Sequence, residues 1–484
     1  MTDATADTLF QRALRAHQAG DLDQAQRLYG QVLAAHPQQV NALTNLSTLY
    51  LHHGRFEEAL LLVARALQID PAQAALHYNY GNILMQAALY ADAAAAYAQA
   101  LALQPATAVF HSNHGIALFK LNRYAEAIAS YDRAIALEPE CAEYYNNRGN
   151  ARGHLGQFTE ALEDYARAVS LAPTLADAHW NRGLLQIMHG DFENGFRHYE
   201  WRWQRPSFAP DLRPLTKPLW LGDALLQGRT ILIYPEQGLG DVIQFSRYVP
   251  MLEALGAQVI LEAPAPLVAL LRAVSKTATM IAKGATPPPY DFQCPIVSLP
   301  LAFRTTLASV PSAVPYLAAA PEKERIWQQK LGPKTRPRIG LAWSGSPTHV
   351  NDHNRSAPLA MLGPLLGMPY DFHAIQKDLR EADRPYLGTM QHHGADLLDF
   401  TDTAALIAQM DLVISVDTSV AHLAGALAKP LWLLLPAIPD YRWLLARDDT
   451  PWYPSARLFR HPMPGDWAGT ITAVAHALEL YFPS

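Results

Sequence analysis

The sequence has few of the residues that build disulfide frameworks, polyanion-binding surfaces or membrane spans. It contains two cysteines, Cys141 and Cys294, without a CxxC pair, which argues against disulfide scaffolds and thiolate metal sites. Lys and Arg number 38 against 44 Asp and Glu, and a net charge of -6 gives no reason to expect nucleic acid as a partner. The most apolar stretch, residues 423–439, is interrupted by Lys429 and Pro430 and is too short to span a bilayer.

The composition instead predicts a folded protein of several domains. Hydrophobic residues make up 50% of the 484 positions, which is enough for more than one core. A typical domain length of ~100–200 residues then predicts about three domains. Residues 1–15 contain acidic side chains and lack the apolar run of a secretory signal. We therefore expect a cytoplasmic protein in a reducing compartment.

The first 200 residues repeat with a period of 34, and a proline marks the end of each copy. The prolines are Pro37, Pro71, Pro105, Pro139 and Pro173. A small residue keeps the same period at Ser47, Gly81, Gly115, Gly149 and Gly183, and a tyrosine at Tyr29, Tyr97, Tyr131, Tyr165 and Tyr199. Because proline stops a helix and small residues let two helices approach closely, each copy is predicted to be a helical hairpin. This is the tetratricopeptide period, so residues 1–205 are expected to stack as an α-solenoid with a concave groove.

An asparagine recurs with the same period on the first helix of each predicted hairpin. The positions are Asn45, Asn79, Asn113, Asn147 and Asn181. A carboxamide both donates and accepts hydrogen bonds, so such a row can hold a peptide backbone without reading its sequence. In the alternative interpretation the amides hydrogen-bond only within the stack. Trp201 and Trp203, which close the array, are expected to seal the last hairpin against the following domain rather than to stack on a ligand.

After Pro206 the period disappears, and short apolar runs alternate with helical stretches. Candidate strands are residues 231–236, 258–263, 279–282 and 292–297, and then 339–343, 371–376, 397–400, 412–416, 431–435 and 457–459. Two consecutive βα arrays predict two Rossmann-like domains, at residues 206–335 and 336–484, which face each other across a cleft. Residues 467–481 are predicted to form a closing helix.

The first candidate strand leads into a glycine turn with an acid at its end. Gly238 and Gly240 permit a tight strand-to-helix turn with exposed backbone N–H groups, and Asp241 follows directly. The third glycine of a dinucleotide fingerprint is absent, so Glu262 is a weak candidate for a ribose-binding acid. Asp241 either caps the following helix or faces the cleft.

The second array supplies a denser group of candidates. Asp417, Thr418 and Ser419 occupy a predicted strand-to-helix turn, and His422 follows one helical turn later, where it can meet a phosphate or ribose. Two cations and a serine also follow predicted strands and suit a diphosphate; these are Ser344, Arg355 and Lys377. The histidines near residues 349–353 and 392–393 have no compact metal-ligand spacing, so no metal site is expected.

These motifs resemble two known families. The repeat array looks like tetratricopeptide repeats with an asparagine ladder similar to that of the O-linked N-acetylglucosamine protein transferases. The remainder resembles a GT-B glycosyltransferase of the bacterial heptosyltransferase type. The matching segments are Gly238-x-Gly240-Asp241 and Asp417-Thr418-Ser419-x-x-His422. Ser419 departs from the glycine usual in that family, so the backbone is expected to approach a phosphate less closely.

The resemblance implies a role for each matching residue. Asp241 would be the general base, while Asp417, Thr418 and His422 would bind the phosphates and ribose of the donor. Arg355, with Lys377 as a second candidate, would neutralise the diphosphate. Proteins that join these two modules typically glycosylate proteins such as flagellins and adhesins.

The predicted function is therefore an inverting, metal-independent glycosyltransferase. It would use a nucleotide sugar as co-substrate, no other cofactor, and a protein acceptor held by the repeats. Two alternatives remain open: a non-catalytic repeat scaffold with a nucleotide-binding module, and a transferase that acts on lipopolysaccharide core. Oligomerisation through the repeats is a further open alternative.

Overall fold

The computed structural model describes residues 3–211, 217–236, 238–349, 351–463 and 465–483. They divide into two compact units, one ending at Asn181 and one beginning at Arg182. In the described ranges, the model contains no helix whose length and hydropathy would let it cross a membrane.

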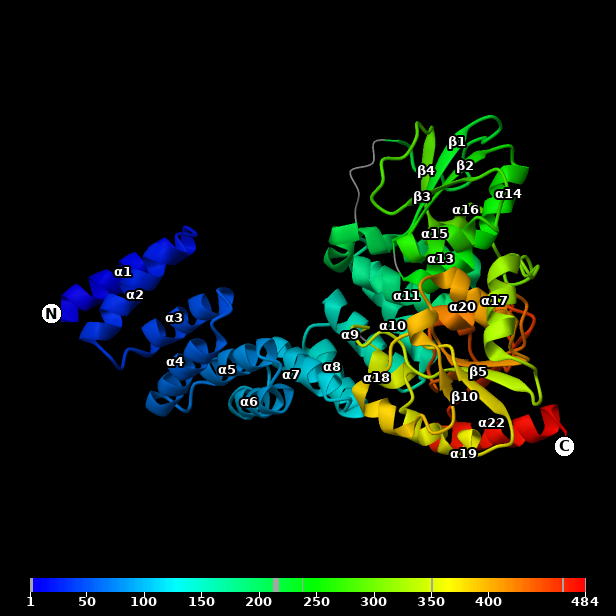
Figure 1. Cartoon of the computed structure of the whole chain (residues 1–484). Helices are drawn as coiled ribbons and strands as arrows, with labels where there is room; N and C mark the ends of the chain where they lie inside the picture. Colours follow the sequence, from blue (N-terminus) through cyan, green and yellow to red (C-terminus); the bar gives the residue numbers. More distant parts are fainter. Residues whose placement is uncertain (1–2, 212–216, 237, 350, 464, 484) are drawn as a thin grey trace. The chain divides into compact units, whose positions relative to one another are not determined.

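Twelve helices precede residue 200 in the described part of the chain, and they alternate with short turns (Figure 1). They are α1 (Asp3–Gln18), α2 (Leu22–Ala35), α3 (Val40–His52), α4 (Phe56–Ile69), α5 (Ala74–Gln86), α6 (Tyr90–Leu103), α7 (Ala108–Lys120), α8 (Tyr124–Leu137), α9 (Ala142–His154), α10 (Phe158–Leu171), α11 (Ala176–Met188) and α12 (Phe192–Tyr199). Within the first unit, α1 to α10 form successive hairpins, and each hairpin also packs against the next. The predicted tetratricopeptide-type solenoid is confirmed.

The periodic small residue and the periodic tyrosine prove to be partners. A Cβ atom added to Gly81 would lie 2.6 Å from Cε1 of Tyr97, and the same clash would occur between Gly115 and Tyr131. In these hairpins, and in the one with Gly149 and Tyr165, the tyrosine on the second helix therefore fills the space that the glycine on the first helix leaves open. Because both positions are fixed by packing within one hairpin, the 34-residue period predicts them directly.

The second unit contains two parallel sheets. The first has the strand order β3-β2-β1-β4 and the second the order β10-β9-β8-β5-β6-β7. The strands are β1 (Thr230–Tyr234), β2 (Gln258–Ala263), β3 (Thr279–Ala282), β4 (Phe292–Pro295), β5 (Arg338–Ala342), β6 (Asp371–Ala374), β7 (Gln391–His392), β8 (Leu412–Val416), β9 (Leu431–Leu435) and β10 (Ala456–Arg460). The predicted α/β region is confirmed, and its central strands β1, β8 and β9 are buried apolar runs, as is usual in parallel sheets.

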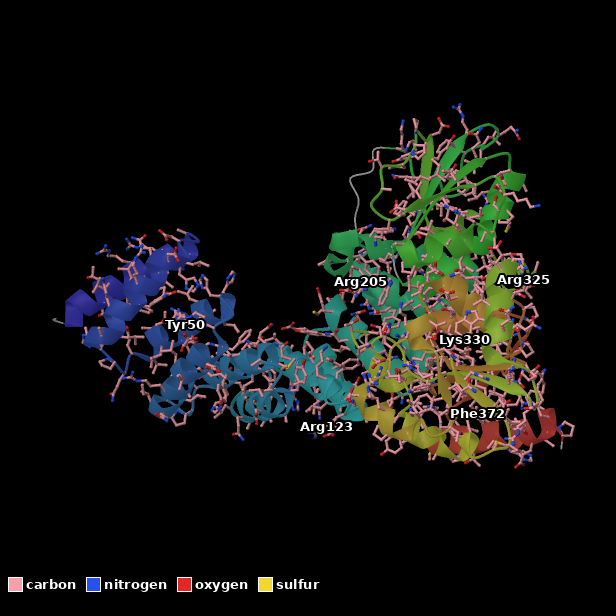
Figure 2. The ribbon with its side chains drawn as sticks, in the orientation of Figure 1. Tyr50, Arg123, Arg205, Arg325, Lys330 and Phe372 are labelled. Carbon is pink, nitrogen blue, oxygen red and sulfur yellow. The ribbon has the colours of Figure 1, made fainter. Side chains whose placement is uncertain are left out.

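Ten helices accompany these sheets in the described part of the unit. They are α13 (Leu239–Phe245), α14 (Val249–Ala254), α15 (Ala265–Leu271), α16 (Leu299–Ala302), α17 (Pro321–Leu331), α18 (Asp352–Arg355), α19 (Gly363–Leu366), α20 (Phe400–Ala408), α21 (Ser419–Ala426) and α22 (Trp467–Tyr481). Helix α17 buries Trp327 and leaves Arg325 and Lys330 exposed (Figure 2). The closing helix α22 has the predicted bounds.

One predicted strand, at residues 397–400, is wrong. Leu398 is exposed, and Asp399 accepts a hydrogen bond from the backbone N–H of Thr401 at 2.8 Å, as the N-cap of α20. Asp402 closes the capping box by accepting from the backbone N–H of Asp399. The edge strand is instead β7, which pairs with β6. A short apolar run was therefore mistaken for a strand, although the Asp-x-x-Asp pattern indicates a helix start.

Candidate active site

The carboxyl ends of both sheets contribute to one group of side chains. In each sheet the strand order reverses once, between β1 and β4 in the first and between β5 and β8 in the second. Ligands of open α/β sheets bind outside the carboxyl ends of the strands at this kind of reversal. The loops after β1 and β8 begin helices α13 and α21, and these two helices pack against each other. The two reversal points are therefore adjacent.

Asp241 lies in the first turn of α13 and is 7% exposed. Its Oδ2 accepts a hydrogen bond from the backbone N–H of Gly238 at 2.9 Å, so the carboxylate caps its own helix. Its Oδ1 accepts from Nη2 of Arg442, on the loop that follows β9. Asp241 thus both caps the helix and faces the second sheet, which combines the two alternatives that the sequence leaves open.

Burial raises the pKa of Asp241 above its ordinary value, although the Arg442 guanidinium opposes that shift. A carboxylate with a raised pKa is a better proton acceptor at neutral pH than an exposed one. Asp440 adds to the rise, because its carboxylate is a like charge near the same guanidinium.

Arg442 is the central residue that sequence reasoning missed. Its Nη1 donates to Oδ1 of Asp440 at 2.7 Å, and its guanidinium lies 4.2 Å from the ring centroid of Tyr441. Its Nε is buried and donates to no described residue. No short motif surrounds Arg442, and 201 positions separate it from Asp241. Its place just after a strand of the second sheet is the one signal that sequence reasoning had available.

Asp417 and Arg355 meet at the reversal point of the second sheet. Nη1 of Arg355 donates to the backbone carbonyl of Asp417 at 3.3 Å. A Cβ atom on Gly345 would lie 2.5 Å from Nη2 of Arg355, so the glycine leaves room for the guanidinium. Burial raises the pKa of Asp417 to about 6; the Asp440 carboxylate adds to this rise, and Arg442 and Arg355 oppose it.

His422 is buried between the two halves of the unit. Its Nδ1 lies 3.0 Å from the hydroxyl of Tyr453, and its ring stacks on Trp443 with centroids 5.2 Å apart. A Cβ atom on Gly240 would lie 2.7 Å from Cδ2 of His422, so this glycine allows α13 to approach α21. Burial lowers the pKa of His422 well below its ordinary value, so the ring is neutral at physiological pH. The geometry makes His422 a packing residue between the two helices in this conformation.

The amino end of α21 is open. Thr418 is the N-cap residue, yet its side chain makes no capping hydrogen bond, and its Oγ1 lies 3.3 Å from Oγ of Ser415. Thr418 and Ser419 are both partly exposed. An uncapped helix amino terminus offers free N–H groups and a positive dipole end to an anion.

Ser344 and Lys377, the other two residues predicted to bind the nucleotide-sugar donor, lie in two different places. Ser344 is buried at the end of β5, where its backbone N–H donates to Oε1 of Gln376 at 3.0 Å. Lys377 is exposed, and its Nζ lies 3.5 Å from the carbonyl oxygen of Leu398. The structure brings Ser344 close to the Arg355 loop through Arg380, whose Nη2 donates to the Gly345 carbonyl at 3.2 Å. It does not bring Lys377 to that loop.

The asparagine ladder divides into two sets. Three of its amides donate within the stack: Asn45 to the Tyr29 hydroxyl at 3.1 Å, Asn113 to the Tyr78 hydroxyl at 2.9 Å and Asn181 to Oδ1 of Asn146 at 3.0 Å. The side chains of Asn79 and Asn147 are half-buried and bond to no described residue. The ladder therefore combines stack-bonded amides with amides that can still bind a ligand.

A second buried charge network supports the loop after β1. Arg202, between Trp201 and Trp203, is 0% exposed and forms two hydrogen bonds of 2.9 Å to the carboxylate of Glu236. Its other nitrogens donate to Glu200 at 2.6 Å and to Ser298 at 2.7 Å. Arg202 therefore makes a buried polar contact with the loop that follows β1.

No group of three or more His, Cys, Asp or Glu side chains in the described ranges is arranged to hold a metal ion. The acidic residues of the site instead face guanidinium groups, as the contacts of Asp241 and Asp440 with Arg442 show.

Comparison with known proteins finds a family match within each part of the chain. Tetratricopeptide repeat models match residues 16–79 and 112–176. The model for glycosyltransferase family 9 (heptosyltransferase) matches residues 389–435, which run from the segment before β7 to the end of β9 and include Asp417 to His422. The chain thus combines tetratricopeptide repeats with a region similar to family 9, and both predicted resemblances are confirmed.

Individual relatives were also found. Protein FlbA of Caulobacter vibrioides is 30% identical over 290 residues, covering 54% of this chain and 48% of FlbA. The chain therefore spans about half the length of that curated relative. Among solved structures, MamA from Desulfovibrio magneticus RS-1 is 22% identical and covers 34% of this chain and 97% of its own, with a TM-score of 0.33. A tetratricopeptide repeat protein from Parabacteroides merdae is 18% identical and covers 42% of this chain and 80% of its own, with a TM-score of 0.38.

Proposed function

We propose that this chain is a GT-B glycosyltransferase that moves a sugar from a nucleotide-sugar donor to a hydroxyl group of a protein acceptor, with inversion at C1. The single observation that supports this most strongly is the position of the family 9 match. It covers the turn Asp417 to His422, which lies where α21 packs against α13 and hence beside Asp241. A family-specific segment and a buried carboxylate from a separate sheet therefore share one site.

The donor diphosphate would bind at the amino end of α21. Backbone N–H groups in the first turn of α21 have no capping side chain and would face the diphosphate, and Arg355 supplies a positive charge beside the Asp417 carbonyl. As the sugar–phosphate bond breaks, negative charge grows on the leaving diphosphate. Preorganised donors that face this charge stabilise the transition state more than the ground state.

Asp241 would act as the general base. The acceptor hydroxyl oxygen attacks C1 of the sugar, its proton passes to the carboxylate of Asp241, and the bonding electron pair leaves with the diphosphate oxygen. Burial of Asp241 and its raised pKa favour proton uptake at this position. Attack from the face opposite the leaving group inverts the configuration at C1.

The repeat array would supply the acceptor. Asn79 and Asn147, whose amides are not used within the stack, would hydrogen-bond an extended segment of the acceptor protein. Flagellin-like and adhesin-like proteins are candidate acceptors of this chemistry. Holding the segment raises the effective concentration of its Ser or Thr hydroxyl near the donor.

Replacing Asp241 by Asn tests the assignment of the base. We expect Asp241→Asn to lower the rate of sugar transfer by roughly 10²–10⁴-fold, the usual range for loss of a general base, without weakening donor binding. The rate is measured as nucleoside diphosphate release from a panel of nucleotide sugars in the presence of acceptor protein. The matched control is Asp291→Asn, because Asp291 accepts from the Thr230 backbone N–H at the opposite end of β1.

The two open alternatives give different results in this assay. A non-catalytic scaffold with a nucleotide-binding module would release no nucleoside diphosphate with any acceptor, even where it binds a nucleotide. A transferase acting on lipopolysaccharide core would transfer sugar to a core oligosaccharide and not to protein. Equal loss of donor binding and transfer in Asp241→Asn would show that Asp241 has a structural role.

A further inference from the structure

The guanidinium of Arg442 has two carboxylate partners and a third carboxylate nearby. It contacts Asp241 from the first sheet and Asp440 from its own loop, and Asp417 lies close enough to respond to its charge. Arg355 is the second guanidinium in this group. In this group the guanidinium of Arg442 is already engaged by two carboxylates, with a third nearby. A diphosphate, which is itself an anion, cannot bind well unless one guanidinium changes partner.

Unpartnered polar atoms occur on both segments that supply the ion pair, namely helix α13 and the loop after β9. Four buried polar atoms form no hydrogen bond to any described residue. They are Nε of Arg442, the hydroxyl oxygen of Tyr441, and Nε2 and Oε1 of Gln244. Gln244 follows Asp241 by one turn of α13, and Tyr441 precedes Arg442. Buried polar groups are normally satisfied, so a set of them beside one ion pair indicates a place that a polar ligand or water completes.

We propose that Arg442 is a diphosphate-binding residue that exchanges partners: it holds Asp241 while the site is empty and moves to the donor diphosphate when a nucleotide sugar binds. This inference rests on the proposed function. The exchange releases Oδ1 of Asp241 at the moment when an acceptor hydroxyl needs a proton acceptor. Donor binding would therefore switch the base from an ion-paired form to a free form.

The exchange makes three predictions about affinity, and the probes are UDP, GDP and ADP. The nucleoside diphosphate that binds the wild type most tightly is titrated by calorimetry, together with its nucleoside. Arg442→Gln is expected to weaken binding of the nucleoside diphosphate by about 10- to 100-fold. It should weaken binding of the nucleoside by less than about threefold. Asp241→Asn is expected to bind the diphosphate about 3- to 10-fold more tightly than wild type, because Arg442 no longer has to leave the Asp241 carboxylate.

The decisive variant is the double change Arg442→Gln with Asp241→Asn. It has the same net charge as wild type and removes the carboxylate of Asp241 together with its guanidinium partner, so it avoids the unpaired buried Asp241 that Arg442→Gln alone would leave; Asp440, which also loses Arg442, is partly exposed. If Arg442 contacts the diphosphate, the double variant binds at least about 10-fold more weakly than wild type. If Arg442 merely neutralises Asp241, the two proteins bind equally, and the exchange is wrong.

A matched control and two further outcomes complete the test. Arg447→Gln removes an arginine that pairs with Asp449 two residues away, as Arg442 pairs with Asp440, and it should leave affinity unchanged. An Asp241→Asn protein that binds no more tightly than wild type would also overturn the exchange, while the proposed transferase would still stand. Failure of all three nucleoside diphosphates to bind the wild type would instead overturn the proposed function itself.

Discussion

Two buried arginines of the α/β unit, Arg202 and Arg442, differ in how many of their guanidinium nitrogens form hydrogen bonds. Every guanidinium nitrogen of Arg202 donates to a described partner, with Glu236 bound through two hydrogen bonds. Arg442 also contacts two carboxylates, yet its Nε has no partner among the described residues. Both side chains are almost fully buried, so burial alone does not separate them.

The difference teaches how to separate a structural ion pair from a functional one. A closed network such as that of Arg202 has no capacity for a ligand, so its contribution is to hold the loop after β1 in place. An open network keeps polar atoms that form no hydrogen bond within the protein. These atoms can hydrogen-bond a substrate, as expected of a binding site. Substitutions at Arg202 should therefore act on stability, and substitutions in the Arg442 group on binding and catalysis.

The largest expected effect on stability is at Arg202. Arg202→Met removes the charge and leaves Glu236 buried without its partner, which is expected to reduce the free energy of unfolding by about 3–5 kcal/mol. Thermal denaturation of the full chain measures this loss. In the double variant Arg202→Met with Glu236→Leu, where no buried charge is left unpaired, much of the stability should return.

The matched control for Arg202 is an exposed pair in the same unit. Nη1 of Arg229 lies 3.7 Å from Asp291, with both side chains largely exposed, so Arg229→Met should change stability by less than about 1 kcal/mol. A similar small change in Arg202→Met would contradict the structural role of the closed network.

The next largest effect is the pH dependence of stability that Asp417, which lies near Arg442, is expected to cause. The folded pKa of Asp417 is about 6, above the ordinary value of 3.8, so the native state binds a proton more tightly than the unfolded state. The stability that this group contributes is fully present below about pH 4 and is lost as pH rises through about 6, by about 3 kcal/mol at most. Asp417→Asn should remove this decline, and it should raise the melting temperature at pH 7.5 but not below pH 4. If Asp417→Asn leaves the pH dependence of the melting temperature unchanged, the pKa of Asp417 is not raised in the folded state.

The repeat array and the strands could be predicted because their signals are local. Gly81 and Tyr97 pack within one hairpin, and strands such as β1, β8 and β9 are short buried apolar runs, so a period or a run in the sequence is sufficient to predict them. The false strand at residues 397–400 shows the limit of this reasoning. The run was apolar, but Asp399 and Asp402 cap a helix there.

The site could be predicted only in part, because its residues come from distant segments. The turns at Asp241 and Asp417 each carry a short motif, whereas Arg442 carries none and meets Asp241 only after both sheets have formed. Lys377 illustrates a different limit. It follows β6, as a cation near a diphosphate should, but its Nζ is directed to the carbonyl of Leu398. The end of a strand therefore gives the sheet edge on which a side chain lies but does not say what it contacts.

The smallest expected effect repeats the contrast between closed and open groups within the repeat array. The amide of Asn113 donates to the Tyr78 hydroxyl and, at 3.1 Å, to Oδ1 of Asn82, whereas Asn79 bonds to no described residue. Asn113→Ala should therefore reduce the free energy of unfolding by about 1 kcal/mol, and Asn79→Ala by less than half of that, as measured by urea denaturation of the full chain. In the transfer assay the order should reverse: because Asn79 keeps its amide free for an acceptor peptide, Asn79→Ala should raise the KM for acceptor protein more than Asn113→Ala does. If both variants change stability equally and leave the acceptor KM unaltered, the free amides of the ladder do not bind the acceptor, and the groove must hold it through other residues.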